Sequence, residues 1–165
     1  MVKKAKRVLV VGGVAGGASA AARIRRLDEE CEIIMFEKGP HVSFSNCALP
    51  FHLSGIIEDH EELVLMKPDD FYNQYRIDAR VYNEVIDIDR ENKRVKVKNV
   101  VTGEEYTESY DKLVLSPGAN PIVPPFEGLD LVNVFTIRNV VDIAKLNVFI
   151  KENNCKDVTV IGGGF

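Results

Sequence analysis

One stretch near the N-terminus constrains the fold of this chain more than any other. Arg7–Val11 is a run of β-branched and aliphatic residues, typical of a strand buried on both faces of a parallel sheet. A glycine-rich turn follows at residues 12–17, and residues 18–27 have the apolar spacing of an amphipathic helix. A second strand is expected at Glu32–Phe36, and Glu37 ends it. This order of elements predicts an α/β fold built on a Rossmann-like parallel sheet.

The turn and the acidic residue together predict a dinucleotide site. Glycines at a strand-to-helix junction leave backbone N–H groups available to a pyrophosphate, which the helix dipole also attracts. Glu37 follows the turn by about 20 residues, where such folds place the carboxylate that accepts the ribose hydroxyls. The strict glycine pattern would need glycine at position 14, where this chain has Val14. Without the flanking strands, a tight strand-to-helix turn would explain these glycines equally well.

The predicted helix has a second, basic face. Ser19, Arg23 and Arg26 are spaced so that they line up along one side of it. A solvated basic stripe is the ordinary explanation for such a pattern. The alternative is a phosphate-binding edge, because the planar guanidinium group suits phosphate oxygens.

A single cysteine stands out in residues 43–50, among small polar residues and before an expected helical turn. A helix N-terminus stabilises a thiolate, and Ser45 or Asn46 could cap such a turn. We therefore interpret Cys47 as a candidate redox nucleophile, with a buried, inert cysteine as the alternative. His52 follows closely and is a candidate base, although a surface histidine is the default interpretation.

These motifs resemble the single-cysteine branch of the FAD-dependent pyridine nucleotide-disulfide oxidoreductases. Within that branch they are most similar to the coenzyme A-disulfide reductases, including those fused to a rhodanese domain that reduce CoA persulfides or polysulfides. The resemblance rests on residues 10–19, 36–39 and 43–51. It implies FAD and NADH or NADPH as cofactors, CoA disulfide or persulfide as substrate, Cys47 as the catalytic thiol, and a homodimer.

The resemblance also assigns the remaining site residues. The expected cofactor-binding positions are Gly12, Gly13, Val14, Ala15, Gly16, Gly17, Glu37, Lys38, Val85, Ser116, Pro117, Gly118, Gly162 and Gly164. The expected CoA-binding positions are Ser19, Arg23, Arg26, Ser43 and Asn46.

Two positions distinguish branches of the family. Relatives with a cysteine pair carry the earlier cysteine at the position of Val42, five residues before Cys47. The resemblance therefore implies that Cys47 has no internal partner and pairs with a small thiol, CoA. NADH oxidases and peroxidases of this branch carry a histidine at the position of Ala15. Their chemistry, in which Cys47 cycles through a sulfenic acid, remains an alternative, as does a flavin-binding fragment without turnover.

The rest of the chain predicts a meander and then a second nucleotide-binding unit. Helices are expected at residues 67–75 and 139–153, antiparallel strands at 80–89, 95–100 and 104–110, and buried parallel strands at 112–115 and 157–161. These elements predict an FAD-binding domain over residues 1–118. They also predict, over 119–165, a crossover and the truncated start of an NAD(P)H-binding domain. We expect the chain to be the N-terminal part of a longer enzyme.

Composition excludes several other classes. The chain of 165 residues has a formal net charge of −4, which disfavours a nucleic-acid surface. It has no apolar run of about 18 residues that would predict a membrane span. Its three cysteines are far apart and form no metal-binding motif, so we interpret Cys31 and Cys155 as inert thiols. A cytoplasmic location is expected.

Overall fold

The computed structural model describes residues 5–162, and its backbone contacts divide the chain into two units. One unit combines residues 1–45 with 61–119, and the other combines residues 46–60 with 120–165. The functional boundary expected after Gly118 stays a prediction. Two short 3-10 helices, η1 (Asn46–Ala48) and η2 (His60–Leu63), lie on the segment that leaves the first unit and returns to it.

The first unit is built on a four-stranded parallel sheet with the order β3-β2-β1-β7. Its strands are β1 (Arg7–Val11), β2 (Glu32–Phe36), β3 (Ile77–Arg80) and β7 (Lys112–Leu115). The predictions of β1, β2 and β7 are confirmed. The placement of Arg80 in the meander is wrong, because Arg80 closes β3, which pairs with β2.

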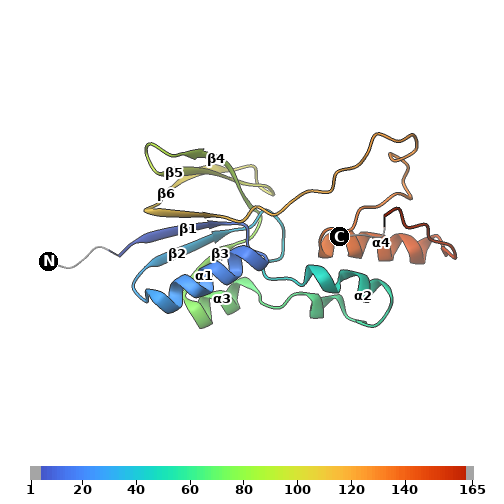
Figure 1. Cartoon of the computed structure of the whole chain (residues 1–165), viewed down its shortest axis with the longest axis horizontal. Helices are drawn as coiled ribbons and strands as arrows, with labels where there is room; N and C mark the ends of the chain where they lie inside the picture. The colour runs from blue at the N-terminus through green and yellow to red at the C-terminus, as the bar shows by residue number, and fades with distance from the viewer. Residues whose placement is uncertain (1–4, 163–165) are drawn as a thin grey trace. The chain divides into compact units, whose positions relative to one another are not determined.

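Two layers cover the sheet (Figure 1). The helices α1 (Ala15–Leu27) and α3 (Pro68–Tyr75) lie on one face. The predicted antiparallel meander lies on the other face, and it consists of β4 (Asn83–Asp89), β5 (Arg94–Asn99) and β6 (Glu105–Ser109). The Rossmann-like α/β prediction with an inserted meander is therefore confirmed.

Each layer has its own core, because successive strand residues point to opposite faces. Toward the helices, the buried side chains are Val8, Val10, Ala18, Ala21, Cys31, Ile33, Met35, Val42, Phe71 and Ile77. Toward the meander they are Leu9, Ile34, Phe36, Val95 and Val97. The alternation of Val8 and Val10 with Leu9 shows why this strand is apolar throughout, since both of its faces are covered.

A charged cluster joins the sheet to the meander. The Glu108 carboxylate accepts from Arg80 Nη1 at 2.7 Å and lies 2.8 Å from Arg7 Nη1. The side chain of Glu108 is only 14% exposed. Burial alone would lower the pKa of Arg80, but its hydrogen bonds to Glu108 and Tyr106 outweigh burial and raise the pKa above its ordinary value. Sequence pattern gave no sign of this cluster, because its members come from three distant segments.

We expect Glu108→Gln to destabilise the protein by about 2 kcal/mol, because it leaves two partly buried guanidinium groups without their shared counter-ion. Urea unfolding measures the change. Glu105, on the same strand as Glu108, provides the matched control. Glu105→Gln breaks an exposed pair with Lys96 of the neighbouring strand and should have no measurable effect. Equal stability of the two variants would contradict this role for Glu108.

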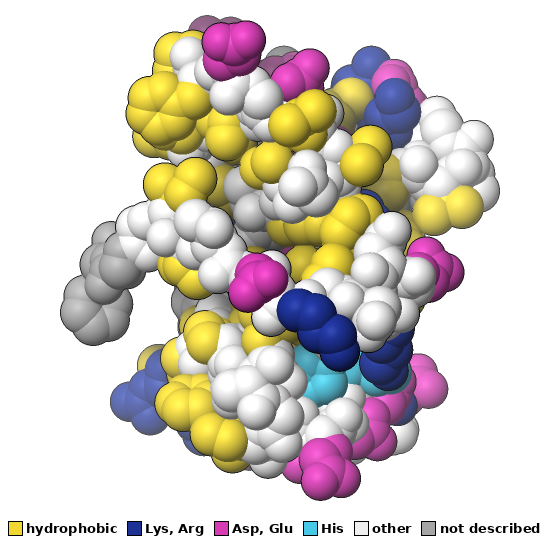
Figure 2. Space-filling view, turned by 90° about the vertical axis from the view of Figure 1, so that its right-hand side faces the viewer, with side chains coloured by type: hydrophobic (Ala, Val, Ile, Leu, Met, Phe, Trp, Pro, Cys, Tyr) yellow, Lys and Arg dark blue, Asp and Glu magenta, His cyan; other side chains and the backbone are white. Residues whose placement is uncertain are grey.

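The second unit contains α2 (Leu49–Leu53) and α4 (Val140–Glu152). The prediction of α4 is confirmed, and Asn139 caps it by accepting from Asp142 N at 3.0 Å. The buried strand predicted at 157–161 is wrong. These residues form no strand, and Val158 and Val160 are 74% and 80% exposed, because the described part of the chain offers them no neighbouring strand. Hydrophobic side chains are accordingly exposed on the face shown in Figure 2.

Candidate functional site

The glycine turn is held against the ends of two strands. Gly12 has a φ of +93°, and its N–H donates to Phe36 O at 2.8 Å. A Cβ atom added to Gly12 would lie 2.0 Å from Ser116 O, just past the end of β7. The backbone angle and this close approach both require glycine.

Gly17 lets α1 approach the turn. A Cβ atom there would lie 1.7 Å from Gly12 O, far inside van der Waals contact. The helix begins at Ala15 and not at the predicted residue 18, so it includes Gly16 and Gly17. Its first bond runs from Ala18 N to Val14 O at 2.9 Å. The N–H groups of the first turn therefore have no partner within the helix, as an anion site requires.

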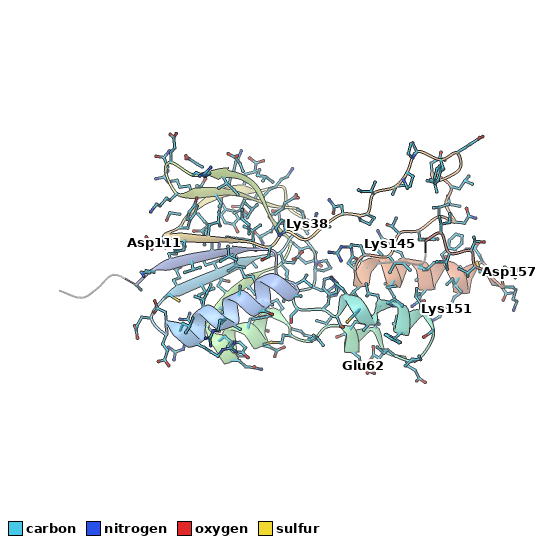
Figure 3. All side chains as sticks on the ribbon, viewed as in Figure 1. Lys38, Glu62, Asp111, Lys145, Lys151 and Asp157 are labelled. Carbon is cyan, nitrogen blue, oxygen red and sulfur yellow. The ribbon has the colours of Figure 1, made fainter. Side chains whose placement is uncertain are left out.

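Glu37 is fixed beside this turn. Its Oε2 accepts from Gly13 N at 2.9 Å and its Oε1 from Gly39 N at 2.8 Å. A carboxylate offers about four acceptor positions, so both oxygens can accept further bonds. Lys38, labelled in Figure 3, is exposed just past the end of β2.

A short strap, residues 42–45, returns to the glycine turn. Ser43 N donates to Gly13 O at 2.8 Å, while Leu65 N donates to Ser43 O at 2.8 Å. Val42 is fully buried, and its Cγ1 would lie 2.7 Å from a Cβ on Gly13. Ser43 has a φ of +49°, so the strap turns sharply here. The chain immediately before the cysteine is thus anchored to the turn.

Cys47 lies in η1, and its side chain is exposed. The N-cap of α2 is Ala48, which provides no side-chain bond, so neither Ser45 nor Asn46 is the N-cap of that helix. Ser45 directly precedes η1, and its capping of that turn stays a prediction. Asn46 Oδ1 is buried and has no hydrogen-bond partner among the described residues. This acceptor matches a ligand that donates a hydrogen bond.

Two contacts within its own unit hold the ring of His52, the candidate base. Its Nδ1 lies 2.7 Å from Ile57 O and its Nε2 lies 3.0 Å from Asn147 Nδ2. The carbonyl takes the ring N–H, and the amide N–H occupies the lone pair of the other nitrogen. Both ring nitrogens therefore contact other residues, and a role of His52 as a base for Cys47 stays a prediction.

The three residues of the basic face point into solvent. Ser19, Arg23 and Arg26 are exposed on α1, and their side chains make no hydrogen bond or ion pair within residues 5–162. Arg25, on the same helix, is different, since its Nε donates to Tyr75 O at 2.8 Å and it binds further carbonyls. The exposed arginines are therefore available to a phosphate, whereas Arg25 ties α1 to the end of α3.

Comparison with known proteins decides the family. The pyridine nucleotide-disulphide oxidoreductase family matches residues 6–165, which is nearly the whole chain. The chain belongs to this family. Its members are flavin-dependent oxidoreductases, so FAD and NADH or NADPH are the cofactors that the fold serves.

Three individual proteins are similar to this chain over most of its length. The coenzyme A disulfide reductase of Staphylococcus aureus strain JH9 is 45% identical over 159 residues, or 96% of this chain and 36% of that protein. The crystal structure of reduced Bacillus anthracis CoADR-RHD has a TM-score of 0.89 at 45% identity, covering 92% of this chain and 28% of that one. An NAD-dependent persulfide reductase from A. fulgidus has a TM-score of 0.84 at 33% identity, covering 88% and 27%. The chain thus spans about a third of these relatives' length.

At the carboxyl end of its parallel sheet, this oxidoreductase domain brings together several of the predicted cofactor positions. The glycine turn, Glu37 and Ser116 meet there, where α/β folds bind ligands. Gly118, two residues after Ser116, has a φ of +71°. Val85 instead lies within β4, where it is partly buried against the meander core, so its flavin contact stays a prediction.

The remaining predicted positions lie in the second unit. Gly162 has a φ of +95° in an exposed segment, and Gly164 lies outside the described residues.

A groove of about 450 Å³ on α4, lined by side chains that include Lys145 (Figure 3), contains none of the predicted site residues. No group of histidine, cysteine and carboxylate side chains in residues 5–162 is arranged to hold a metal ion. None of the helices described is long and apolar enough to span a bilayer.

Proposed function

We propose that the protein is a flavoprotein disulfide reductase that uses NAD(P)H and FAD to reduce CoA disulfide through the single thiol of Cys47. One observation carries the proposal. Cys47 is exposed two residues after a strap that is bonded to the glycine turn, and Val42 in that strap is fully buried. By the family resemblance, Val42 occupies the position of the earlier cysteine of relatives with a cysteine pair. The similarity to coenzyme A disulfide reductase supports the choice of substrate.

The residues present fit a bound FAD. The unpaired N–H groups at the start of α1 suit the pyrophosphate, and the fixed Glu37 carboxylate suits the ribose hydroxyls. Gly12 and Gly17 leave no space for side chains at the turn, so the backbone itself forms the binding surface. When bound, FAD supplies two-electron transfer from the reduced nicotinamide to a disulfide.

Cys47 performs the sulfur chemistry. Its thiolate attacks one sulfur of CoA disulfide, so a Cys47–CoA mixed disulfide forms and the first CoA leaves as a thiolate, which takes up a proton. Two electrons that originate in NAD(P)H then cleave the mixed disulfide. The second CoA leaves and the Cys47 thiolate is restored for another turnover.

The CoA nucleotide would bind along α1. Ser19, Arg23 and Arg26 form an exposed polar edge whose guanidinium groups suit phosphates. Ser43 lies within the strap and Asn46 directly follows it, and both would contact the part of CoA nearer its sulfur. The buried Oδ1 of Asn46 would then accept a hydrogen bond that the described residues do not supply.

CoA persulfide is a second candidate substrate, favoured by the similarity to a persulfide reductase at 33% identity. The same thiolate would attack the CoA-bound sulfur and release hydrosulfide.

A cytoplasmic location is consistent with either reaction, because a reducing compartment keeps Cys47 as a thiol. We also propose a homodimer for the whole protein, which light scattering on the full-length protein would test.

Arg26→Ala tests the substrate assignment directly. In the full-length protein it should raise KM for CoA disulfide about tenfold, because one phosphate contact is lost, with kcat nearly unchanged. Pantetheine disulfide, which lacks the nucleotide, should show no change in KM. Glu29→Gln, an exposed change on the loop after the same helix, is the control. Equal effects of Arg26→Ala on both disulfides would contradict recognition of the CoA nucleotide on α1.

A further inference from the structure

The turn that carries Cys47 depends on anchors elsewhere in its unit. α2 follows η1 directly and has only five residues, Leu49–Leu53. So short a helix is not stable by itself, and Ala48 gives it no side-chain cap. Its side chains must therefore hold it in place. Leu49, which is 2% exposed, and His52 are three residues apart and lie on the same face.

His52 is the polar anchor. Its Nδ1–H donates to Ile57 O at 2.7 Å, and its Nε2 accepts from Asn147 Nδ2 at 3.0 Å. These two contacts fix the orientation of the ring. One side chain therefore joins α2, the loop after it and α4.

α4 provides a firm reference for this bond. It has 13 residues and a capping box in which Asn139 and Asp142 bond each other's backbone N–H groups. Ile143 is fully buried, and Asn147 lies one turn further along the same face. The amide that holds His52 is thus on the inner side of a well-anchored helix, and α2 packs against α4.

We propose that His52 is a positioning residue that, through α2 and together with Asn147, fixes the place of the Cys47 thiol. The inference rests on the proposed thiol role of Cys47 and gives His52 no proton to transfer. Loss of both ring bonds leaves Leu49 as the anchor of a one-turn helix. The thiol then samples a wider range of positions, which slows reactions that need a fixed geometry.

Three variants of the full-length protein test this role. His52→Phe keeps a ring but removes both hydrogen bonds. His52→Gln keeps one donor and one acceptor, and Asn147→Leu removes only the bond to α4. We expect His52→Phe to lower kcat for CoA disulfide about tenfold, with FAD content and KM for the reduced nicotinamide nucleotide unchanged. His52→Gln should recover kcat to within about threefold of the wild type.

The pair should also act as a unit. The double variant His52→Phe/Asn147→Leu should be no slower than His52→Phe alone, because the shared bond can be lost only once. A kcat for His52→Phe within about twofold of the wild type, or His52→Gln as slow as His52→Phe, would overturn the proposal. If His52→Phe does not fold, Asn147→Leu decides, and an unchanged kcat would overturn the proposal. Retained turnover in Cys47→Ser would instead overturn the thiol chemistry itself.

Discussion

Cys47→Ser is expected to lower the turnover of CoA disulfide by at least about a thousandfold while leaving FAD bound. Serine keeps the size of the side chain but cannot form the mixed disulfide. Cys47 is exposed and lies outside the glycine turn, so its replacement should not disturb the flavin site. Steady-state assays of the full-length protein, with flavin absorbance measured on the same samples, give both quantities.

The other two cysteines provide matched controls. Cys155→Ser, on a half-buried thiol, should retain full turnover. Cys31 is buried, and burial raises the pKa of its thiol, so it stays protonated and unreactive near neutral pH. Cys31→Ser should therefore affect stability rather than chemistry. Substantial turnover in Cys47→Ser, or its loss in Cys155→Ser, would contradict the assignment.

Gly17→Ala is expected to destabilise the protein by more than about 3 kcal/mol and to abolish FAD binding. The added methyl group would lie 1.7 Å from Gly12 O, so β1 and α1 would have to separate. Separation would move the N–H groups at the start of α1 away from the Glu37 carboxylate, so the two could no longer contact the same FAD. Urea unfolding and flavin absorbance would measure the two effects.

Gly16→Ala is the matched control for this prediction. Its Cβ atom would lie 3.3 Å from Ser116 Oγ, the end of a side chain that can rotate away. Alanine also favours a helix over glycine by up to about 1 kcal/mol, so the unfolding free energy should hardly fall. Equal destabilisation by the two substitutions would show that the close approach at Gly17 is not what requires glycine.

Sequence patterns correctly predicted those helices and strands whose formation depends on residues close together in the chain. The apolar runs on either side of the glycine turn predicted β1, β2 and the helix between them, because burial and backbone freedom act there within a few residues. β3 was missed because Ile77 is its only fully buried residue. The strand predicted at 157–161 did not form for the opposite reason, since its residues favour a strand but pair with no other strand in residues 5–162.

The residues of the candidate site could be predicted from the sequence, but the hydrogen bonds between them could not. Cys47, the turn and Glu37 stand in recognisable motifs. The bonds that fix them join residues far apart in the sequence, as between Gly13 and Ser43 or between His52 and Asn147. No spacing rule predicts such pairs from one sequence. A histidine close to a cysteine therefore suggested a base, whereas the structure uses both ring nitrogens to hold α2.

The central claim is that Cys47 forms a disulfide with CoA during turnover. The most direct measurement is the mass of the Cys47 peptide, isolated after the full-length protein has reacted with CoA disulfide without reductant. We predict the added mass of one CoA less two hydrogens, removed completely by the reduced nicotinamide nucleotide. An unmodified Cys47 peptide, or one that carries only a single added oxygen, would contradict this account.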